Sequence, residues 1–326
     1  METTPPGLRG GIDLGGTKIQ TVIAGPDGQV RGEARHPTPT TGGPADVAHA
    51  MEDALREAAS AAGVRPEQLD GVGVGSPGDA DGKTGVVSGA RNLPGWEGSF
   101  PLGETLGKAL GTGIRIGNDV QVAVEGEYRL GAGQPYRSLL GVWWGTGVGG
   151  GIVLGGEPWL GRGAAGEIGH TVVKRGGARC PCGRRGCLEA YAGRAAMEAK
   201  ARREHAAGVE TDLFKIMEKR GRDRLTSSVW EHALREKDPL TESLIRRAVR
   251  YLGTGIASAC NLLDVEAVVI GGGLGVRFGE RYAAEIEREM GKHIFVAEDP
   301  PKMHIAELGD LGGAIGASLL VGSQPE

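Results

Sequence analysis

Three of the four cysteines of this 326-residue chain lie within eight residues of one another, and a histidine stands ten residues before the first of them. One imidazole and three thiols are the ligand count of a closed tetrahedral zinc site, and here they are His170, Cys180, Cys182 and Cys187. A disulfide framework would need an even number of cysteines spread along the chain. Four protein ligands leave no coordination position for water, so the sequence predicts structural rather than catalytic Zn²⁺.

Two glutamates flank this predicted zinc loop, Glu167 in "GAAGEIGH" and Glu189 in "GCLEAYAG". Scattered glutamates usually belong to a solvated surface, but a metal-clamped loop would hold these two rigidly. Paired carboxylates on a rigid frame suit a polyol, because each sugar hydroxyl offers a hydrogen-bond donor. We also expect His170 to bind zinc through one ring nitrogen and the substrate through the other.

Another candidate acid lies in "IRIGNDVQVAVEGE", where an expected strand ends at Asn118 and an expected helix follows Asp119. Both residue types are favoured as helix N-caps, so a purely structural role is one interpretation. The other interpretation is catalytic, with Asp119 taking the proton from a substrate hydroxyl during phosphoryl transfer. The spacing alone is compatible with both.

Glycine is unusually frequent, at 60 residues, and clusters where expected strands run into turns, in "DLGGTK", "WWGTGVGGG" and "VIGGGLG". Such turns let backbone N–H groups approach anionic oxygens, so the pattern predicts a phosphate-bearing ligand. The chain has no G-x-x-x-x-G-K-[ST] P-loop, and the last cluster does not complete a dinucleotide fingerprint. Asp13 would repel a phosphate at the first turn unless a cation such as Mg²⁺ lay between them, and Thr17 offers a hydroxyl to a phosphate oxygen.

These motifs recur in two halves of the chain that are expected to fold alike. Each half opens with a glycine-rich hairpin, at 9–36 and 138–160, and continues in alternating helices and strands. This order predicts a duplicated α/β unit with a cleft between the copies. The charged, weakly periodic residues 200–240 are expected to form a surface excursion. The expected domains are a small α/β domain at 1–118, closed by a C-terminal helix at 309–326, and a large α/β domain at 119–308 that carries the zinc site.

The charge balance and the cysteine usage argue against several classes of protein. Lys and Arg number 37 against 41 Asp and Glu, and the resulting net charge of −4 argues against a nucleic-acid-binding protein. The N-terminal stretch shows no signal peptide, and no apolar run approaches the ~20 residues of a membrane span. Together with the clustered thiols, these features predict a cytoplasmic protein without nucleic-acid or membrane partners.

The motifs taken together resemble those of the ROK (repressor, open reading frame, kinase) sugar kinases, over essentially the whole chain. "GIDLGGTK" is similar to the family's first phosphate motif, "GVWWGTGVGGGIVLGG" to its second, and "VVIGGGLG" to its adenosine-side turn. "EIGH" followed by "CPCGRRGCLE" resembles the family's zinc and sugar signature. The resemblance implies the actin-like ATPase (ribonuclease H-like) fold, in two domains around a cleft. It also implies transfer of a phosphoryl group from ATP, with Mg²⁺, to the 6-hydroxyl of a hexose.

The same resemblance assigns roles to individual residues. Asp119 matches the catalytic base, and the zinc ligands match the four residues predicted above. The residues that match sugar-binding positions are Gly75, Asn92, Asn118, Asp119, Glu167, His170 and Glu189. Those that match the phosphate and nucleoside turns are Asp13, Gly15, Gly16, Thr17, Lys18, Gly145, Thr146, Gly147, Gly271, Gly272 and Gly273. A homodimer or homotetramer is also implied.

Several alternatives share these motifs. Glucose is the expected substrate because "NLPGW" looks most like bacterial glucokinases, while kinases of N-acetylglucosamine, mannose, fructose or a C7-cyclitol share most other motifs. The family's repressors carry a helix-turn-helix segment ahead of the first phosphate motif, which here begins about ten residues from the start. A non-catalytic sugar sensor is another alternative, although the intact Asp119 speaks against it. The sequence around the cysteines favours ATP over polyphosphate as the donor.

Overall fold

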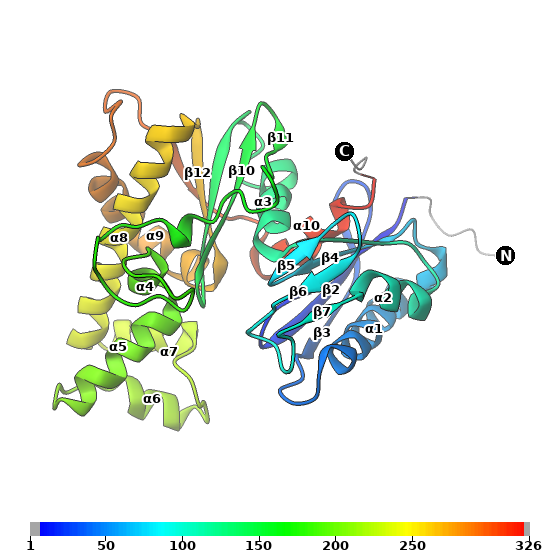
Figure 1. Ribbon diagram of the computed structural model, residues 1–326, viewed down its shortest axis with the longest axis horizontal. Coiled ribbons are helices and arrows are strands. Elements are labelled where there is room, and N and C mark those ends of the chain that lie inside the picture. The colour runs from blue at the N-terminus through cyan, green and yellow to red at the C-terminus, as the bar shows by residue number, and fades with distance from the viewer. Residues whose placement is uncertain (1–6, 323–326) are drawn as a thin grey trace. The chain divides into compact units, whose positions relative to one another are not determined.

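The computed structural model describes residues 7–322, which form two compact units (Figure 1). The first unit contains the chain up to Gln134 and again from Glu307 onward, and the second unit is Pro135–Ala306. The chain therefore leaves the first unit once and returns to it near the end. Of the closing segment expected at 309–326, residues 323–326 lie outside the described part. No helix within residues 7–322 combines the length and the apolar content needed to cross a membrane.

A five-stranded sheet forms the centre of the first unit, in the order β3-β2-β1-β4-β8. Strands β3, β2 and β1 are antiparallel, and β4 and β8 extend the sheet in parallel with β1. The strands of this sheet are β1 (Arg9–Leu14), β2 (Lys18–Ala24), β3 (Val30–Pro37), β4 (Val72–Ser76) and β8 (Ile114–Asn118). A smaller sheet consists of β5 (Asp79–Asp81), β6 (Val86–Ser88) and β7 (Ser99–Phe100). The α-helices are α1 (Pro44–Ala61), α2 (Leu102–Leu110), α3 (Asp119–Leu130) and α10 (Gly312–Leu319).

Two glycines let helix α10 lie directly on the first sheet. Gly11 of β1 and Gly73 of β4 are cross-strand neighbours. A Cβ atom at Gly11 would lie 1.9 Å from the carbonyl oxygen of Ala314, and one at Gly73 would lie 1.7 Å from that of Ala317. Since neither atom fits, a larger residue at either position would push α10 off the sheet. The buried apolar stripe of α1 belongs to the main hydrophobic core of this unit.

The second unit repeats this topology. Its sheet has the order β11-β10-β9-β12-β13, with three antiparallel strands followed by two that run parallel to β9. The match in strand order and direction confirms the predicted duplication of an α/β unit. The strands are β9 (Leu139–Trp144), β10 (Val148–Leu154), β11 (Glu157–Pro158), β12 (Ala267–Gly271) and β13 (Lys302–Ile305). The α-helices are α4 (Glu189–Ala192), α5 (Arg194–Ala206), α6 (Leu213–Lys219), α7 (Ser227–Arg235), α8 (Pro239–Leu263) and α9 (Gly272–Gly291).

The expectation that residues 200–240 form a surface excursion is wrong. They fold largely into helices, and Leu213, Val229 and Trp230 are fully buried in the core of the second unit. Each of these helices is short and buries only a few apolar residues among many charged ones. The mean composition of the segment therefore hides the stripe that packs against the core.

Helix α3 lies in the first unit, whereas a boundary after residue 118 assigns it to the second. Its contact with α10 explains the difference, because Gly126 and Gly316 let the two helices approach closely. A Cβ atom at Gly126 would lie 3.0 Å from the Cα of Gly316. The division of the chain into two functional domains at residues 118/119 stays a prediction.

The buried carboxylate of Glu127, on α3, accepts hydrogen bonds from the backbone next to both points where the chain passes from one unit to the other. Glu127 is 2% exposed, and its Oε2 accepts hydrogen bonds from the N–H groups of Ala132 (3.1 Å) and Glu307 (3.0 Å). Its Oε1 accepts a third from the N–H of Leu308 (2.8 Å). Ala132 lies just before the first crossing and Glu307 just after the second. The three donors satisfy a carboxylate that would otherwise be costly to bury.

Candidate functional site

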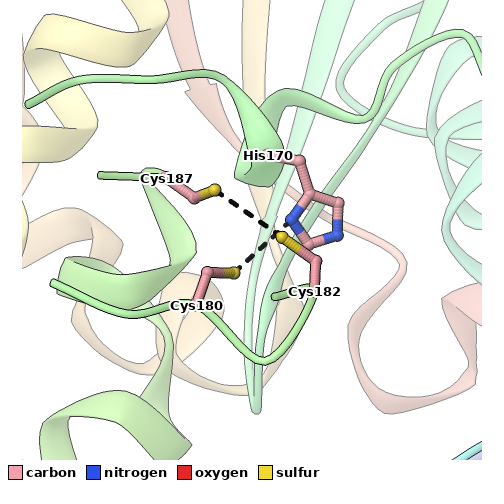
Figure 2. Close-up of side chains that lie close together, drawn as sticks. All are labelled: His170, Cys180, Cys182 and Cys187. Atoms are coloured by element: carbon pink, nitrogen blue, oxygen red, sulfur yellow. Dashed lines mark hydrogen bonds between the residues drawn. The ribbon is translucent and has the colours of Figure 1, made fainter. Parts of the chain in front are cut away.

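The four predicted zinc ligands converge in the second unit (Figure 2). Their ligand atoms all lie within 4.8 Å of one another. The Sγ atoms of Cys182 and Cys187 are 3.8 Å apart, and the Sγ of Cys180 is 3.7 Å from Nδ1 of His170. In a tetrahedral site with zinc–ligand bonds of about 2.0–2.3 Å, neighbouring ligand atoms are separated by about 3.5–3.8 Å. The cluster therefore fits Zn²⁺, and Nδ1 is the ring nitrogen that faces the thiols.

The other ring nitrogen of His170 faces a carboxylate. His170 ends the short 3₁₀ helix η2 (Ile168–His170), and its Nε2 lies 3.8 Å from Oε2 of Glu167. The His170 side chain is 32% exposed and that of Glu167 is 56% exposed. This arrangement is consistent with the expected double role of the imidazole, in which metal binding at one nitrogen orients the other.

The thiols of the cluster differ in their surroundings. Cys180 and Cys187 are buried, and burial raises the pKa of the Cys180 thiol to about 12. The pKa of Cys182 is lowered instead, chiefly because the backbone N–H of Arg184 donates to its sulfur. Bound Zn²⁺ would supply the positive charge that stabilises all three sulfurs as thiolates.

Aromatic side chains fix the zinc loop to the rest of the second unit. The hydroxyl oxygen of Tyr191 accepts a hydrogen bond from the N–H of Ala178 at 2.7 Å. The Tyr191 ring stacks on Tyr251 of α8, with 4.0 Å between centroids, and the guanidinium of Arg247 lies 4.9 Å from the Tyr191 ring. The loop is thereby tied to the longest helix of the unit.

Glu189 connects the zinc cluster to the second glycine-rich turn. Its Oε2 accepts a hydrogen bond from the N–H of Val148 at 3.0 Å, and its Oε1 lies 3.8 Å from the Sγ of Cys180. A Cβ atom at Gly147 would lie 2.2 Å from Oε2 of Glu189, so a side chain at this position would displace the carboxylate. The carboxylate that was expected to bind sugar therefore also holds the turn Gly145–Gly147 in place.

The second and third glycine-rich turns lie against each other. A Cβ atom at Gly272, where φ is +80°, would lie 2.8 Å from the carbonyl oxygen of Trp144. One at Gly145 would lie 3.9 Å from the backbone nitrogen of Gly273, and one at Gly273 would lie 3.1 Å from Oγ of Ser227. The β9–β10 turn thus adjoins the N-terminus of α9, where the first backbone N–H groups of the helix are suited to phosphate oxygens.

In the first unit, Asp13 is the penultimate residue of β1, beside the first glycine-rich turn. The turn closes with a hydrogen bond from the N–H of Gly15 to the carbonyl of Lys18 at 2.9 Å. Thr38 fixes it from the neighbouring strand end, because its hydroxyl donates to the carbonyl of Gly15 at 2.6 Å and its N–H to that of Thr17 at 3.3 Å. Thr38 cannot be predicted from the sequence as part of this site, since nothing in its spacing relates it to the turn.

The electrostatics of Asp13 favour a cation at this turn. Burial raises the pKa of its carboxyl group from 3.8 to about 6, an effect that Lys18 opposes and Asp310 reinforces. The carboxyl group lies where α10 begins, since a Cβ atom at Gly313 would lie 2.8 Å from its carboxyl carbon. A bound divalent cation would favour the charged form of the carboxylate, so the residue fits the predicted Mg²⁺.

Asn118 has a clear structural role next to the predicted base. Its Oδ1 accepts hydrogen bonds from the N–H groups of Val120 (3.1 Å) and Gln121 (3.2 Å), which makes it the N-cap of α3. Asp119 is the first residue of that helix. Gly75 of β4 lies close by, because a Cβ atom there would be 3.3 Å from the Cα of Asp119.

The structure therefore gathers the predicted site residues in two groups, one in each unit. Asn92 joins the first group because its Nδ2 would be 3.2 Å from a Cβ atom at Gly16. The first unit holds Asp13, Gly15, Gly16, Thr17, Lys18, Gly75, Asn92, Asn118 and Asp119. The second unit holds Gly145, Thr146, Gly147, Glu167, His170, Cys180, Cys182, Cys187, Glu189, Gly271, Gly272 and Gly273.

Comparison with known proteins identifies the family. The model of the ROK family matches residues 9–324. The chain belongs to the ROK family. This ROK protein is 34% identical to a glucokinase of Halalkalibacterium halodurans over 317 residues, which are 96% of this chain and 94% of the relative. It is 32% identical to an N-acetylmannosamine kinase of Escherichia fergusonii over 316 residues, 95% of this chain and 96% of the relative.

A solved structure agrees with this assignment. The chain resembles a ROK family glucokinase from Streptomyces griseus in complex with glucose and AMPPNP, with a TM-score of 0.81 and 31% identity. The match covers 96% of this chain and 99% of the glucokinase. The actin-like ATPase fold that the motifs imply is thereby confirmed.

Proposed function

We propose that this ROK protein is a sugar kinase that transfers the γ-phosphoryl group of ATP to the 6-hydroxyl of a hexose, and that the hexose is glucose. The observation that carries the proposal is the full-length similarity to glucokinases, one of them solved with glucose and AMPPNP. The glycine-rich turns and the two glutamates that flank the zinc loop supply the matching chemistry, for phosphates and for sugar hydroxyls.

In the proposed reaction Asp119 is the general base. It takes the proton of the 6-hydroxyl, the hydroxyl oxygen forms a bond to the γ-phosphorus, and the bond from that phosphorus to the bridging oxygen breaks to release ADP. Asp119 is the first residue of α3 and lies at the positive end of the helix dipole. The Asn118 cap keeps this helix start in place.

The phosphate contacts are proposed to come from the three glycine-rich turns. The turns at Gly15–Thr17 and Gly145–Gly147 would bind phosphate oxygens through backbone N–H groups, and Gly271–Gly273 would face the nucleoside. Mg²⁺, held on the side of Asp13, would neutralise phosphate charge when bound. Lys18, whose Nζ lies 3.9 Å from the exposed Asp310, adds a positive charge to the first turn.

The sugar ligands are proposed to be Glu167, His170 and Glu189 around the zinc loop, with Gly75, Asn92, Asn118 and Asp119 in the first unit. Zinc holds the loop, so its contribution is to fix the positions of the two carboxylates and of the Nε2 of His170. We further propose that the protein is cytoplasmic, acts without nucleic-acid or membrane partners, and assembles as a homodimer or homotetramer.

A second candidate substrate is N-acetylmannosamine, because kinases of that sugar are similar to this chain over nearly the same length and at nearly the same identity. The test is turnover of ATP by the zinc-replete protein with glucose, N-acetylmannosamine, N-acetylglucosamine, mannose and fructose. We expect kcat/KM to be highest for glucose by at least about tenfold. A higher value for another sugar would refute glucose alone, and ATP-independent or absent turnover with all of them would refute the kinase proposal.

A further inference from the structure

Arg194, the first residue of α5, contacts the second glycine-rich turn through its backbone and its side chain. Its N–H donates to the carbonyl of Gly145 at 3.1 Å, and the N–H of Ala195 donates to that of Thr146 at 3.0 Å. The guanidinium donates through Nη2 to the hydroxyl oxygen of Thr146 at 2.7 Å and through Nη1 to the carbonyl of Leu225 at 2.8 Å. One side chain thus joins the turn to the segment that leads into α7.

The positive charge of this guanidinium has no direct counter-ion in the described part of the chain. Its two hydrogen bonds go to a hydroxyl and a carbonyl, which are both neutral. The charge of Glu198 acts on it, but the Glu198 carboxylate accepts hydrogen bonds from the N–H of Leu225 and from Arg202. Arg224 adds a further positive charge. A half-buried cation without an ion pair, beside a glycine-rich turn that adjoins the N-terminus of α9, is a favourable place for an anion.

The bond to Thr146 also determines where the Thr146 hydroxyl points. The hydroxyl oxygen accepts the guanidinium N–H, so its own hydrogen is directed elsewhere, and Thr146 is exposed. An exposed hydroxyl oriented in this way is a donor for a ligand oxygen.

We propose that Arg194 is a positioning residue for the terminal phosphates of the nucleoside triphosphate. It orients the Thr146 hydroxyl toward a phosphate oxygen and supplies the positive charge that compensates the β- and γ-phosphates. The inference rests on the proposed function, and it adds a residue that discriminates nucleoside triphosphate from nucleoside monophosphate. Because AMP lacks the β- and γ-phosphates, its binding should depend little on Arg194.

The test is the dissociation constant of AMP-PNP and of AMP, measured by calorimetry without sugar on the zinc-replete protein. R194M is expected to weaken AMP-PNP binding by about 10–100-fold, the range for loss of a hydrogen bond to a charged group, and to change AMP binding by less than threefold. The AMP-PNP affinity of R194K is expected to lie between those of wild type and R194M, because an ammonium keeps the charge but not the planar pair of donors. R203M is the control, since it removes an exposed charge from the same helix. Its dissociation constants for AMP-PNP and AMP should match those of wild type.

A second variant keeps the test decisive if R194M folds poorly. T146V removes the hydroxyl and leaves the guanidinium in place, and it is expected to weaken AMP-PNP binding while changing AMP binding by less than threefold. Wild-type AMP-PNP affinity in T146V would contradict the proposed role of the hydroxyl. Wild-type AMP-PNP affinity in R194M, or an equal loss of AMP and AMP-PNP affinity, would overturn the inference while leaving the kinase proposal intact. Failure of the wild-type protein to bind AMP-PNP would overturn both.

Discussion

Replacing Asp13 by asparagine should stabilise the ligand-free protein at pH 8 while impairing its activity. Burial raises the pKa of the Asp13 carboxyl from 3.8 to about 6, so the folded state carries a charge there at pH 8 that its surroundings disfavour. A difference of about two pKa units corresponds to about 3 kcal/mol. The side chain is partly exposed, so we expect about 2 kcal/mol. The gain is about 4–8 °C in the melting temperature of a domain of this size.

The pH dependence follows from the sign of the shift. The folded protein binds the Asp13 proton more tightly than the unfolded chain, so wild-type stability rises relative to D13N as the pH falls through 6 toward 3.8. The free energy of unfolding of D13N should exceed that of wild type by the full amount at pH 8 and by about half of it at pH 5, and the difference should vanish below about pH 4. Activity is expected to fall at every pH, since the carboxylate that would hold Mg²⁺ is gone.

Calorimetric melting of the zinc-replete protein without nucleotide or Mg²⁺, at pH 8 and pH 5, measures this difference. D310N is the matched control, because it removes one negative charge from a side chain that is 83% exposed, and it should change stability by less than about 0.5 kcal/mol. A D13N protein that is less stable than wild type at pH 8, or an advantage of equal size at both pH values, would refute the reasoning.

Three further predictions concern catalysis, the zinc loop and the chain crossings. D119A should fold normally and lose at least about 100-fold in kcat, and steady-state kinetics with retained activity would remove Asp119 from the role of base. C182S should lower the melting temperature and raise the sugar KM, because the loop that carries the proposed sugar ligands loses a zinc ligand; a zinc-free variant with normal sugar binding would contradict this. E127A should lower the free energy of unfolding by about 3 kcal/mol or more, since three backbone N–H groups lose the carboxylate that accepts their hydrogen bonds. E125A, which removes the hydrogen bond from Arg129, should cost about 1 kcal/mol in the same urea titration.

Features that depend on residues close together in the sequence could be predicted. The zinc ligands follow from the ligand count within 170–187, and the duplicated sheet follows from two glycine-rich hairpins with the same continuation. Gly147 shows what a short stretch does not reveal. The sequence indicates a phosphate turn at this position, but it does not show that the Glu189 carboxylate occupies the space that a side chain at 147 would need.

Other features depend on contacts between residues far apart in the chain. Arg194 reaches Thr146 across 48 positions, and Glu127 reaches Leu308 across 181, so no local spacing indicates either contact. Glu127 looks like an ordinary charged residue on a helix until the crossing segments are placed around it. The burial of part of 200–240 cannot be predicted from composition, because a few buried residues, such as Trp230, are outnumbered by charged neighbours.

The central claim is phosphoryl transfer to the 6-hydroxyl of glucose, and the most direct test is ³¹P and ¹H NMR of the products formed from ATP and glucose. We predict one phosphomonoester, located on C6 of glucose, for each ADP formed, and no such signal with D119A. Formation of inorganic phosphate alone, or of a sugar phosphate at another hydroxyl, would contradict the account.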